Sequence, residues 1–145
     1  MPTVRAFHDL PATPGLAQRL WTDLSRWPTF IDGFGHVLEV SDSWPRPGAK
    51  LIWRSTPAGR GRVTERVVEH EEGRFATDIF EDQLSGRQTL WFEPEVVRME
   101  LDYTLARGGP FSALTDVLFI RRAQTMALER TLRRFSTEAA DEATL

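Results

Sequence analysis

The 145-residue chain contains no cysteine, and Lys50 is its only lysine. Without cysteine, disulfide bonds, thiolate catalysis and cysteine-based metal sites are excluded. The sequence also has no apolar run near the roughly 18 residues that a membrane-spanning helix needs, so stable membrane insertion is not expected. The N-terminus lacks the charged and then apolar pattern of a signal peptide. We therefore expect a cytoplasmic protein.

The overall charge disfavours a nucleic-acid-binding function. The formal net charge is -3 and the isoelectric point is near 5.6, whereas nucleic-acid-binding domains are usually basic. We interpret the arginines near the C-terminus as a solvated helix face. The length is typical of one domain, here residues 1–145.

Motifs for metal, phosphate or hydrolase chemistry are missing. The three histidines, His8, His36 and His70, do not share metal-ligand spacing on one element. No Gly-x-Ser-x-Gly motif is present, and the segment GRGR (59–62) lacks the Gly-Lys-Ser/Thr ending of a phosphate loop. We expect neither a metal site nor a cofactor.

The N-terminal third predicts one strand and two short helices. Residues 3–10 are typical of a strand, and Thr13 with Pro14 is a favourable helix start. The pair Trp27-Pro28 is expected to end that helix, because a residue before proline avoids helical geometry. A second short helix or turn is then expected, ending at the glycines of TFIDGFG.

The middle of the chain predicts six strands separated by turn signals, and the C-terminal part predicts one long helix. Short connections favour an antiparallel meander. We expect strands at 36–44, 49–56, 62–71, 74–82, 87–93 and 96–106, and a helix from about 111 to about 139. One face of such a sheet must be covered, and the long helix is the only element large enough.

The strands differ in how cleanly they alternate. The last strand places Val97, Met99, Leu101, Tyr103 and Leu105 on one apolar face. The strands at 62–71 and 74–82 mix polar and apolar residues on both faces. Two explanations remain open: a solvated or ligand-filled hollow, which tolerates buried polar groups, or edge strands with two wet faces.

Arg121 interrupts the apolar stripe expected on the last helix. At about 100° per residue it lies among the stripe residues, which are Leu114, Val117, Leu118, Thr125, Leu128, Leu132 and Phe135. Its guanidinium either reaches water along an apolar stem or faces something inside the protein.

Four segments, in this order and spacing, resemble the START-like (SRPBCC) superfamily, and within it the polyketide cyclase/dehydrase and lipid transport group. The first is LPATPGLAQRLWTDLSRWPTF, which contains the family's Asp-x-x-x-Trp-Pro pattern as Asp23, Trp27 and Pro28. The others are PRPGAKLIWR, VTERVVEHEEGRF and LTDVLFIRRAQTMALERTLRRF. The third departs from the family, because Glu72-Gly73-Arg74 stands where Pro-Pro-Arg is usual.

The resemblance implies an α+β helix-grip fold. In that fold a seven-stranded antiparallel sheet wraps around a long C-terminal helix, two short helices follow strand 1, and a deep apolar cavity lies between sheet and helix. Relatives bind lipids, sterols, polyketides, quinones or hormones there, and some cyclise polyketides. Since fold alone does not specify function, the ligand stays undetermined.

Eight side chains are candidates for binding a ligand in such a cavity: Arg121, Tyr103, Trp53, Met99, Phe92, Leu118, Thr125 and Asp78. Three roles stay open for Arg121, namely contact with an anionic ligand group, an ion pair with an internal acid such as Asp78 or Glu65, and snorkelling. Both acids are more typical of the surface, and the Tyr103 hydroxyl is more typically bonded to backbone. No catalytic residue is assigned.

Three functions follow as hypotheses. The favoured one is a protein, monomeric or homodimeric, that binds one small hydrophobic molecule. The second is an aromatase/cyclase-type enzyme, which requires convergent polar groups in the pocket. The third is a protein-interaction module, which requires an exposed apolar patch.

Overall fold

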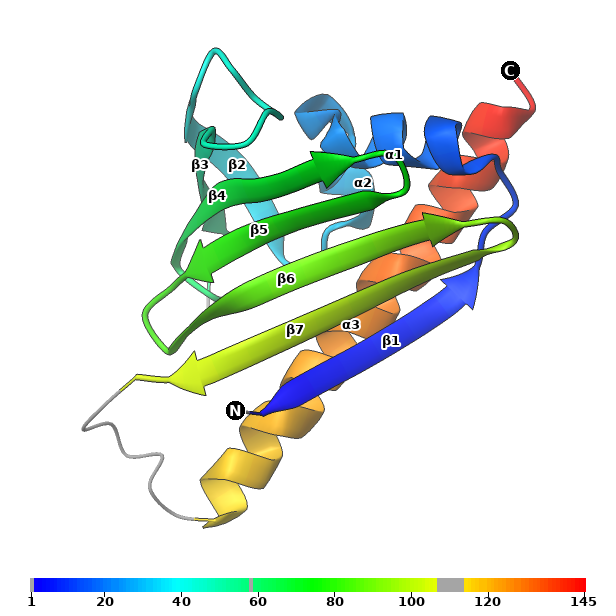
Figure 1. Cartoon of the computed structure of the whole chain (residues 1–145). Helices are drawn as coiled ribbons and strands as arrows, with labels where there is room; N and C mark the ends of the chain where they lie inside the picture. The colour runs from blue at the N-terminus through cyan, green and yellow to red at the C-terminus, as the bar shows by residue number, and fades with distance from the viewer. Residues whose placement is uncertain (1, 58, 107–113) are drawn as a thin grey trace.

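The computed structural model describes residues 2–57, 59–106 and 114–145, with the side chains of 114–116 excepted. Within these residues the elements follow the expected order (Figure 1). They are β1 (Thr3–Asp9), α1 (Pro14–Thr22), the 3₁₀-helix η1 (Leu24–Arg26), α2 (Trp27–Phe30), β2 (Phe34–Val40), β3 (Lys50–Ser55), β4 (Arg62–Glu71), β5 (Arg74–Phe80), β6 (Leu84–Glu93), β7 (Val96–Leu105) and α3 (Leu114–Ala143).

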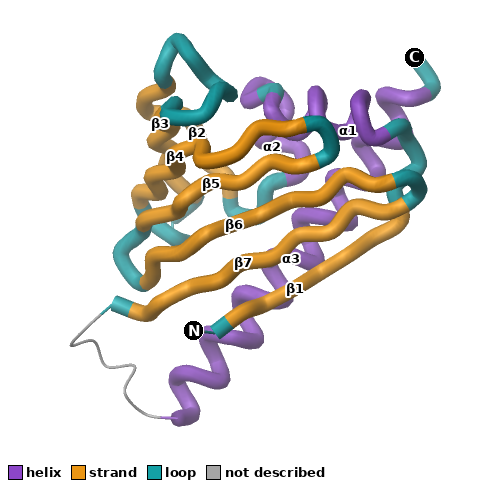
Figure 2. Tube along the Cα trace, viewed as in Figure 1, coloured by secondary structure: helices purple, strands orange, loops and turns teal. Residues whose placement is uncertain are grey.

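The strands form one antiparallel sheet with the order β1-β7-β6-β5-β4-β3-β2. Strands β2 to β7 are a meander, and β1 closes the other side by pairing with β7. The long helix α3 runs diagonally across one face of the sheet, as the tube view also shows (Figure 2). This arrangement is the expected helix-grip fold.

The two N-terminal helices differ in detail from the expectation. Thr13 caps α1 as predicted, with its side-chain oxygen accepting from the Leu16 N–H at 3.3 Å. The helix ends at Thr22, however, because the next residue, Asp23, leaves helical geometry and caps η1. The prediction that Trp27-Pro28 ends a helix is wrong. The pair begins α2, since proline is tolerated in a first helical turn.

Most strand boundaries lie within a few residues of the predicted ones. Strand β2 is shifted and ends at Val40, because residues 41–48 form turns that lead into β3. Strand β6 begins earlier than predicted, at Leu84. Its Gly86 lies so close to β7 that a Cβ atom there would sit 2.1 Å from the Asp102 carbonyl oxygen, so only glycine fits.

The strands with mixed faces are central. Strands β4 and β5 lie third and fourth from the β2 edge of the seven-stranded sheet, so the edge-strand explanation for their polar residues is wrong. Their inward positions carry Val63, Glu65 and Val67 on β4 and Phe75, Thr77 and Ile79 on β5, and all six are buried. Polar groups therefore lie on the covered face of the sheet.

An aromatic cluster anchors α3 to the first helices. Trp21 packs edge-on against Phe135, with ring centroids 5.2 Å apart, and Phe30 contacts Phe135 in the same way at 5.1 Å. The Trp27 indole N–H donates to the Trp21 carbonyl at 2.6 Å. These contacts hold the C-terminal half of α3 against α1 and α2.

The buried face of α3 differs from the predicted stripe in its N-terminal half. Leu128, Leu132 and Phe135 are buried as expected, and Ile120 is buried as well. In contrast, Leu118 is 57% exposed and Arg121 is exposed. The first turns of α3 extend beyond the sheet (Figure 1), and none of the described strands runs alongside them.

Candidate functional site

A pocket of about 320 Å³ lies between the inner face of the sheet and α3. The backbone of α3 comes close to β1 and α2 rather than to the middle strands, which leaves room under the helix. The sheet contributes Trp53, Glu65, Gln88, Met99 and Leu101, and α3 contributes Ala123, Gln124, Ala127, Leu128, Arg130 and Thr131. The remaining wall comes from the segments 31–33 and 59–60.

Glu65 is the buried acid of this pocket. Its side chain lies on β4 between two buried valines and is 3% exposed. The Trp53 indole N–H donates to its Oε2 at 2.8 Å, and the Thr77 hydroxyl donates to its Oε1 at 3.0 Å. Burial raises the pKa of Glu65, because the charged form loses hydration, and these hydrogen bonds and Arg60 offset only part of the effect.

Arg60 closes one side of the pocket. Its guanidinium lies over the Trp53 ring, 5.2 Å from the centroid, and forms an ion pair with Glu81. The Glu81 side chain is 2% exposed and that of Arg60 is 27% exposed, so water reaches this pair only from the Arg60 side. Arg60 is therefore held by a cation–π contact and a carboxylate, and its charge is compensated.

A second ion-pair group borders the pocket where α2 meets α3. Arg130 donates to both carboxylate oxygens of Asp32 at 3.1 Å, and Arg134 donates to Oδ1 at 3.2 Å. The Asp32 backbone N–H donates to the Thr131 hydroxyl at 3.0 Å. This group ties the loop after α2 to the helix, and it pairs the charges of Asp32 and Arg130.

Two of the eight predicted ligand-binding residues line the pocket. Trp53 and Met99 lie on its wall, and their role in binding stays a prediction. Phe92 belongs instead to the aromatic core, 6.5 Å from Trp21 between ring centroids. Asp78 does not line the pocket, because its carboxylate lies on the outer face, as is typical of a surface acid, and accepts from Arg87 at 2.8 Å. Leu118 is exposed and lies outside the pocket.

The other predicted residues form a separate group toward the N-terminal end of α3. Tyr103 is 1% exposed, and burial raises its pKa, while the nearby positive charge of Arg121 acts in the opposite direction. Thr125 donates its hydroxyl to the Arg121 carbonyl at 2.9 Å. Among the described residues Arg121 forms no ion pair with an acid, and its positive charge lies near enough to Tyr103 to affect the pKa of that hydroxyl.

Sequence reasoning missed several polar residues of the pocket. The interpretation of Glu65 as a surface acid is wrong, although its position between Val63 and Val67 was a signal of burial. Gln88 shares a strand face with Leu90 and Phe92, which was a similar signal. Arg60 lies in a loop and Gln124 on a helix, and no local pattern indicated that either faces the sheet.

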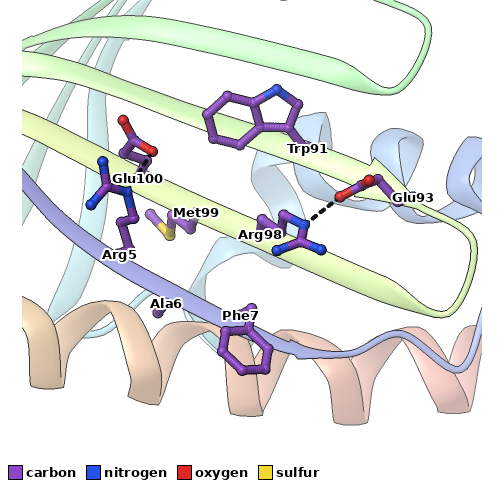
Figure 3. Close-up of a pocket in the computed structure, with 8 residues that line it drawn as sticks. All are labelled: Arg5, Ala6, Phe7, Trp91, Glu93, Arg98, Met99 and Glu100. Carbon is purple, nitrogen blue, oxygen red and sulfur yellow. Dashed lines mark hydrogen bonds and ion pairs between the residues drawn. The ribbon is translucent and has the colours of Figure 1, made fainter.

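A groove of about 470 Å³ crosses the outer face of the sheet over β1, β7 and β6 (Figure 3). Phe7, 73% exposed, lies on one side and Trp91 on the other. Its charged residues are paired on the surface, Arg5 with Glu100 and Arg98 with Glu93. Exposed ion pairs of this kind are well hydrated and contribute little to the stability of the fold. The pocket under α3, which has a buried acid, is the stronger candidate site.

Two features are absent from the part of the chain that the structure describes. None of the helices there is long and apolar enough to span a membrane. The same residues hold no cluster of three or more histidine or acidic side chains arranged to bind a metal ion.

Comparison with known families decides the family. The model of the polyketide cyclase / dehydrase and lipid transport family matches residues 1–140. The chain belongs to this family. No curated protein matches the chain by sequence.

Solved structures share the fold at low sequence identity. TTHA0849 from Thermus thermophilus is 21% identical, with a TM-score of 0.76 over 98% of this chain and 99% of that one. A truncated norcoclaurine synthase from Thalictrum flavum is 12% identical, with a TM-score of 0.69 over 93% and 91%. Another structure of that synthase, in complex with dopamine and hydroxybenzaldehyde, is 11% identical, with a TM-score of 0.64 over 97% and 87%. At these identities the likeness concerns the fold alone.

Proposed function

We propose that this protein binds one small, mostly apolar molecule in the pocket between the sheet and α3. The observation that carries the proposal is the pocket itself, a space of about 320 Å³ under the helix of the helix-grip fold. Small-molecule sites have volumes of roughly 300 to 1,000 Å³ and combine apolar walls with a few polar groups. Trp53, Met99, Leu101 and Leu128 supply apolar wall here, and Glu65 and Gln88 supply polar atoms.

Membership of the polyketide cyclase / dehydrase and lipid transport family supports the same class of ligand. A structural neighbour with this fold, the norcoclaurine synthase, was solved with two small aromatic molecules. Neither fact names the ligand of this chain, because sequence identity to the neighbour is low.

A second candidate function is cyclase-type catalysis on the bound molecule. It is favoured by Glu65, because a buried acid with a raised pKa at a pocket wall suits proton transfer to or from a carbonyl compound. Turnover of polyketide-like substrates, lost in E65Q, would support this function over simple binding.

The binding proposal is tested by filling the pocket. Ala127 lines it from α3, so Ala127→Trp places a large side chain where a ligand would lie. Ala143→Trp, at an exposed position near the end of the same helix, is the matched control. Protein purified gently from its host is analysed by native mass spectrometry and after denaturing extraction.

The proposal expects a stoichiometric small molecule on the wild type and on Ala143→Trp, and none on folded Ala127→Trp. Retention of the same molecule by folded Ala127→Trp contradicts binding in this pocket.

A further inference from the structure

One ionisable residue of the pocket has no oppositely charged partner in an ion pair among the described residues. Four ionisable side chains line it, namely Asp32, Arg60, Glu65 and Arg130. Asp32 pairs with Arg130, and Arg60 pairs with Glu81. Glu65 instead receives hydrogen bonds from two neutral donors. A ligand therefore meets compensated charges everywhere except at Glu65.

The strand register explains why Glu65 faces the ligand space. Glu65 pairs with Leu51 on β3 and with Ile79 on β5, so all three point to the inner face. Its hydrogen-bond donors, Trp53 and Thr77, are the diagonal neighbours on the same two strands. Gln88 on β6 lies opposite Thr77 and continues this polar row into the pocket wall.

We propose that Glu65, in its neutral acid form, selects the ligand by donating a hydrogen bond to an uncharged acceptor, a carbonyl oxygen on an otherwise apolar molecule. This inference rests on the binding function proposed above and narrows its ligand class. Both carboxyl oxygens already accept a hydrogen bond from the protein, so what a neutral carboxyl adds is its one O–H donor.

The charges around the pocket favour a neutral ligand group over an ionic one. A cationic amine would share the pocket with the guanidinium groups of Arg60 and Arg130, both of which line it. An anionic group would compete with Asp32 and Glu81 for those arginines and would lie against Glu65. A carbonyl oxygen needs only one donor, and the burial of Glu65 limits the water that would compete for it.

The proposal implies a pH dependence with a definite sign. The charged groups facing Glu65 are Arg60 and Glu81 beside it, and Asp32 and Arg130 from α2 and α3 across the pocket. Glu81 forms an ion pair with Arg60, and Asp32 forms one with Arg130. Affinity for a carbonyl ligand therefore falls as the pH rises through the pKa of Glu65, which burial places above its ordinary value.

The experiment uses three matched probes measured by isothermal titration calorimetry on the full chain. Benzophenone carries a carbonyl group between its two rings. In 1,1-diphenylethylene a methylene group replaces the carbonyl oxygen, and in benzhydrylamine a cationic amine stands at the same carbon. At low pH we expect benzophenone to bind about tenfold more tightly than diphenylethylene, the effect of one desolvated hydrogen bond. This preference is lost as the pH rises through the raised pKa of Glu65, because the carboxyl group then has no proton to donate.

Three variants make the test specific. Glu65→Gln keeps an N–H donor, so it retains a preference for benzophenone that no longer changes with pH. Glu65→Met removes the donor, so benzophenone and diphenylethylene bind equally at every pH. Glu93→Gln, which changes an acid on the outer face, behaves as the wild type. Photo-crosslinking of bound benzophenone to the pocket wall, including Met99, locates the probe.

The outcomes separate this inference from the binding function. If both neutral probes bind equally at all pH values and Ala127→Trp abolishes both, the binding function stands and the role of Glu65 is overturned. Tighter binding of benzhydrylamine with rising pH also overturns it, in favour of a cation site. If none of the probes binds while the wild type still carries a molecule in native mass spectrometry, the binding function stands and selection of a carbonyl by Glu65 is overturned.

Discussion

Glu65 combines a position typical of the core with a side chain typical of the surface. Its strand neighbours Val63 and Val67 are buried, and its carboxyl group is buried with them. Burying a carboxylate without a cation is unfavourable, so folding shifts the group toward its neutral form. The amount by which Glu65 lowers the free energy of unfolding therefore depends on pH.

Replacing Glu65 with glutamine should change how stability depends on pH. In the unfolded chain Glu65 has an ordinary pKa of about 4.3, and in the folded protein its pKa is raised. Between these two values the folded state holds a proton that the unfolded state has lost, so wild-type stability falls as the pH rises. Above the pKa that Glu65 has in the folded protein, the wild type has lost the full amount of this stability.

Urea unfolding of the wild type and Glu65→Gln across the pH range measures this effect. The stability of the variant relative to the wild type should increase from about pH 4 upward and level off above the raised pKa. Parallel pH curves for the two proteins would show that Glu65 ionises as freely in the folded state as in the unfolded chain.

Tyr103 offers a direct probe of Arg121, because it is the only tyrosine in the chain. Burial raises its pKa, and the charge of Arg121 lowers it. Arg121→Leu should therefore raise the pKa of Tyr103 further, as measured by phenolate absorbance during alkaline titration. Arg122→Leu, at the adjacent exposed position, is the control and should leave the titration unchanged. Equal titration of the wild type and Arg121→Leu would contradict the proximity of the two side chains.

At the scale of elements, α3 is held mainly through its C-terminal half. Phe135 and Leu132 are fully buried there, and the last turns are tied to η1 by Arg26, which pairs with Glu138 at 2.9 Å and with Glu142 at 2.8 Å. The N-terminal half exposes Leu118 and Phe119. The helix thus has a packed end and an end with few partners among the described residues.

Truncating Phe135 should be the costliest change on this helix. Phe135→Ala removes a ring in contact with Trp21, Phe30 and Phe92 and is expected to destabilise the protein by about 3–5 kcal/mol. Arg133→Ala, on the exposed face of the same turn, should change stability by less than about 0.5 kcal/mol. Chemical denaturation measures both, and a similar small loss for each would mean that α3 is not anchored through the aromatic cluster.

For the molecule as a whole, we propose that residues 1–145 fold as one domain. One cluster of buried residues contains side chains from every strand except β2, from α1 and α2, and from α3, so these elements are expected to unfold together. Tryptophan fluorescence reports mainly on the cluster, and far-ultraviolet circular dichroism reports on helix and strand content. The two signals should follow the same single denaturation transition. Separate midpoints would indicate more than one folding unit.

The order of elements followed from the sequence because its signals are local. Turn residues such as Gly73 separate the strands, Thr13 and Pro14 start α1, and the alternation of Val97, Met99 and Leu101 defines the inner face of β7. The family pattern added the wrapping of the sheet around the last helix. The predicted helix boundary at Trp27 was wrong. A proline in the first turn of a helix is compatible with helical geometry, whereas a proline later in a helix breaks it.

The candidate site was only partly predictable, because it depends on which elements come face to face. The sequence by itself determined the helix-grip order and supplied Trp53 and Met99 for the pocket wall. Only the tertiary structure decided that β4 is central, which buries Glu65, and that α3 extends beyond the sheet, which exposes Arg121. Periodicity specifies the faces of a single element, whereas burial depends on the neighbour that packs against each face.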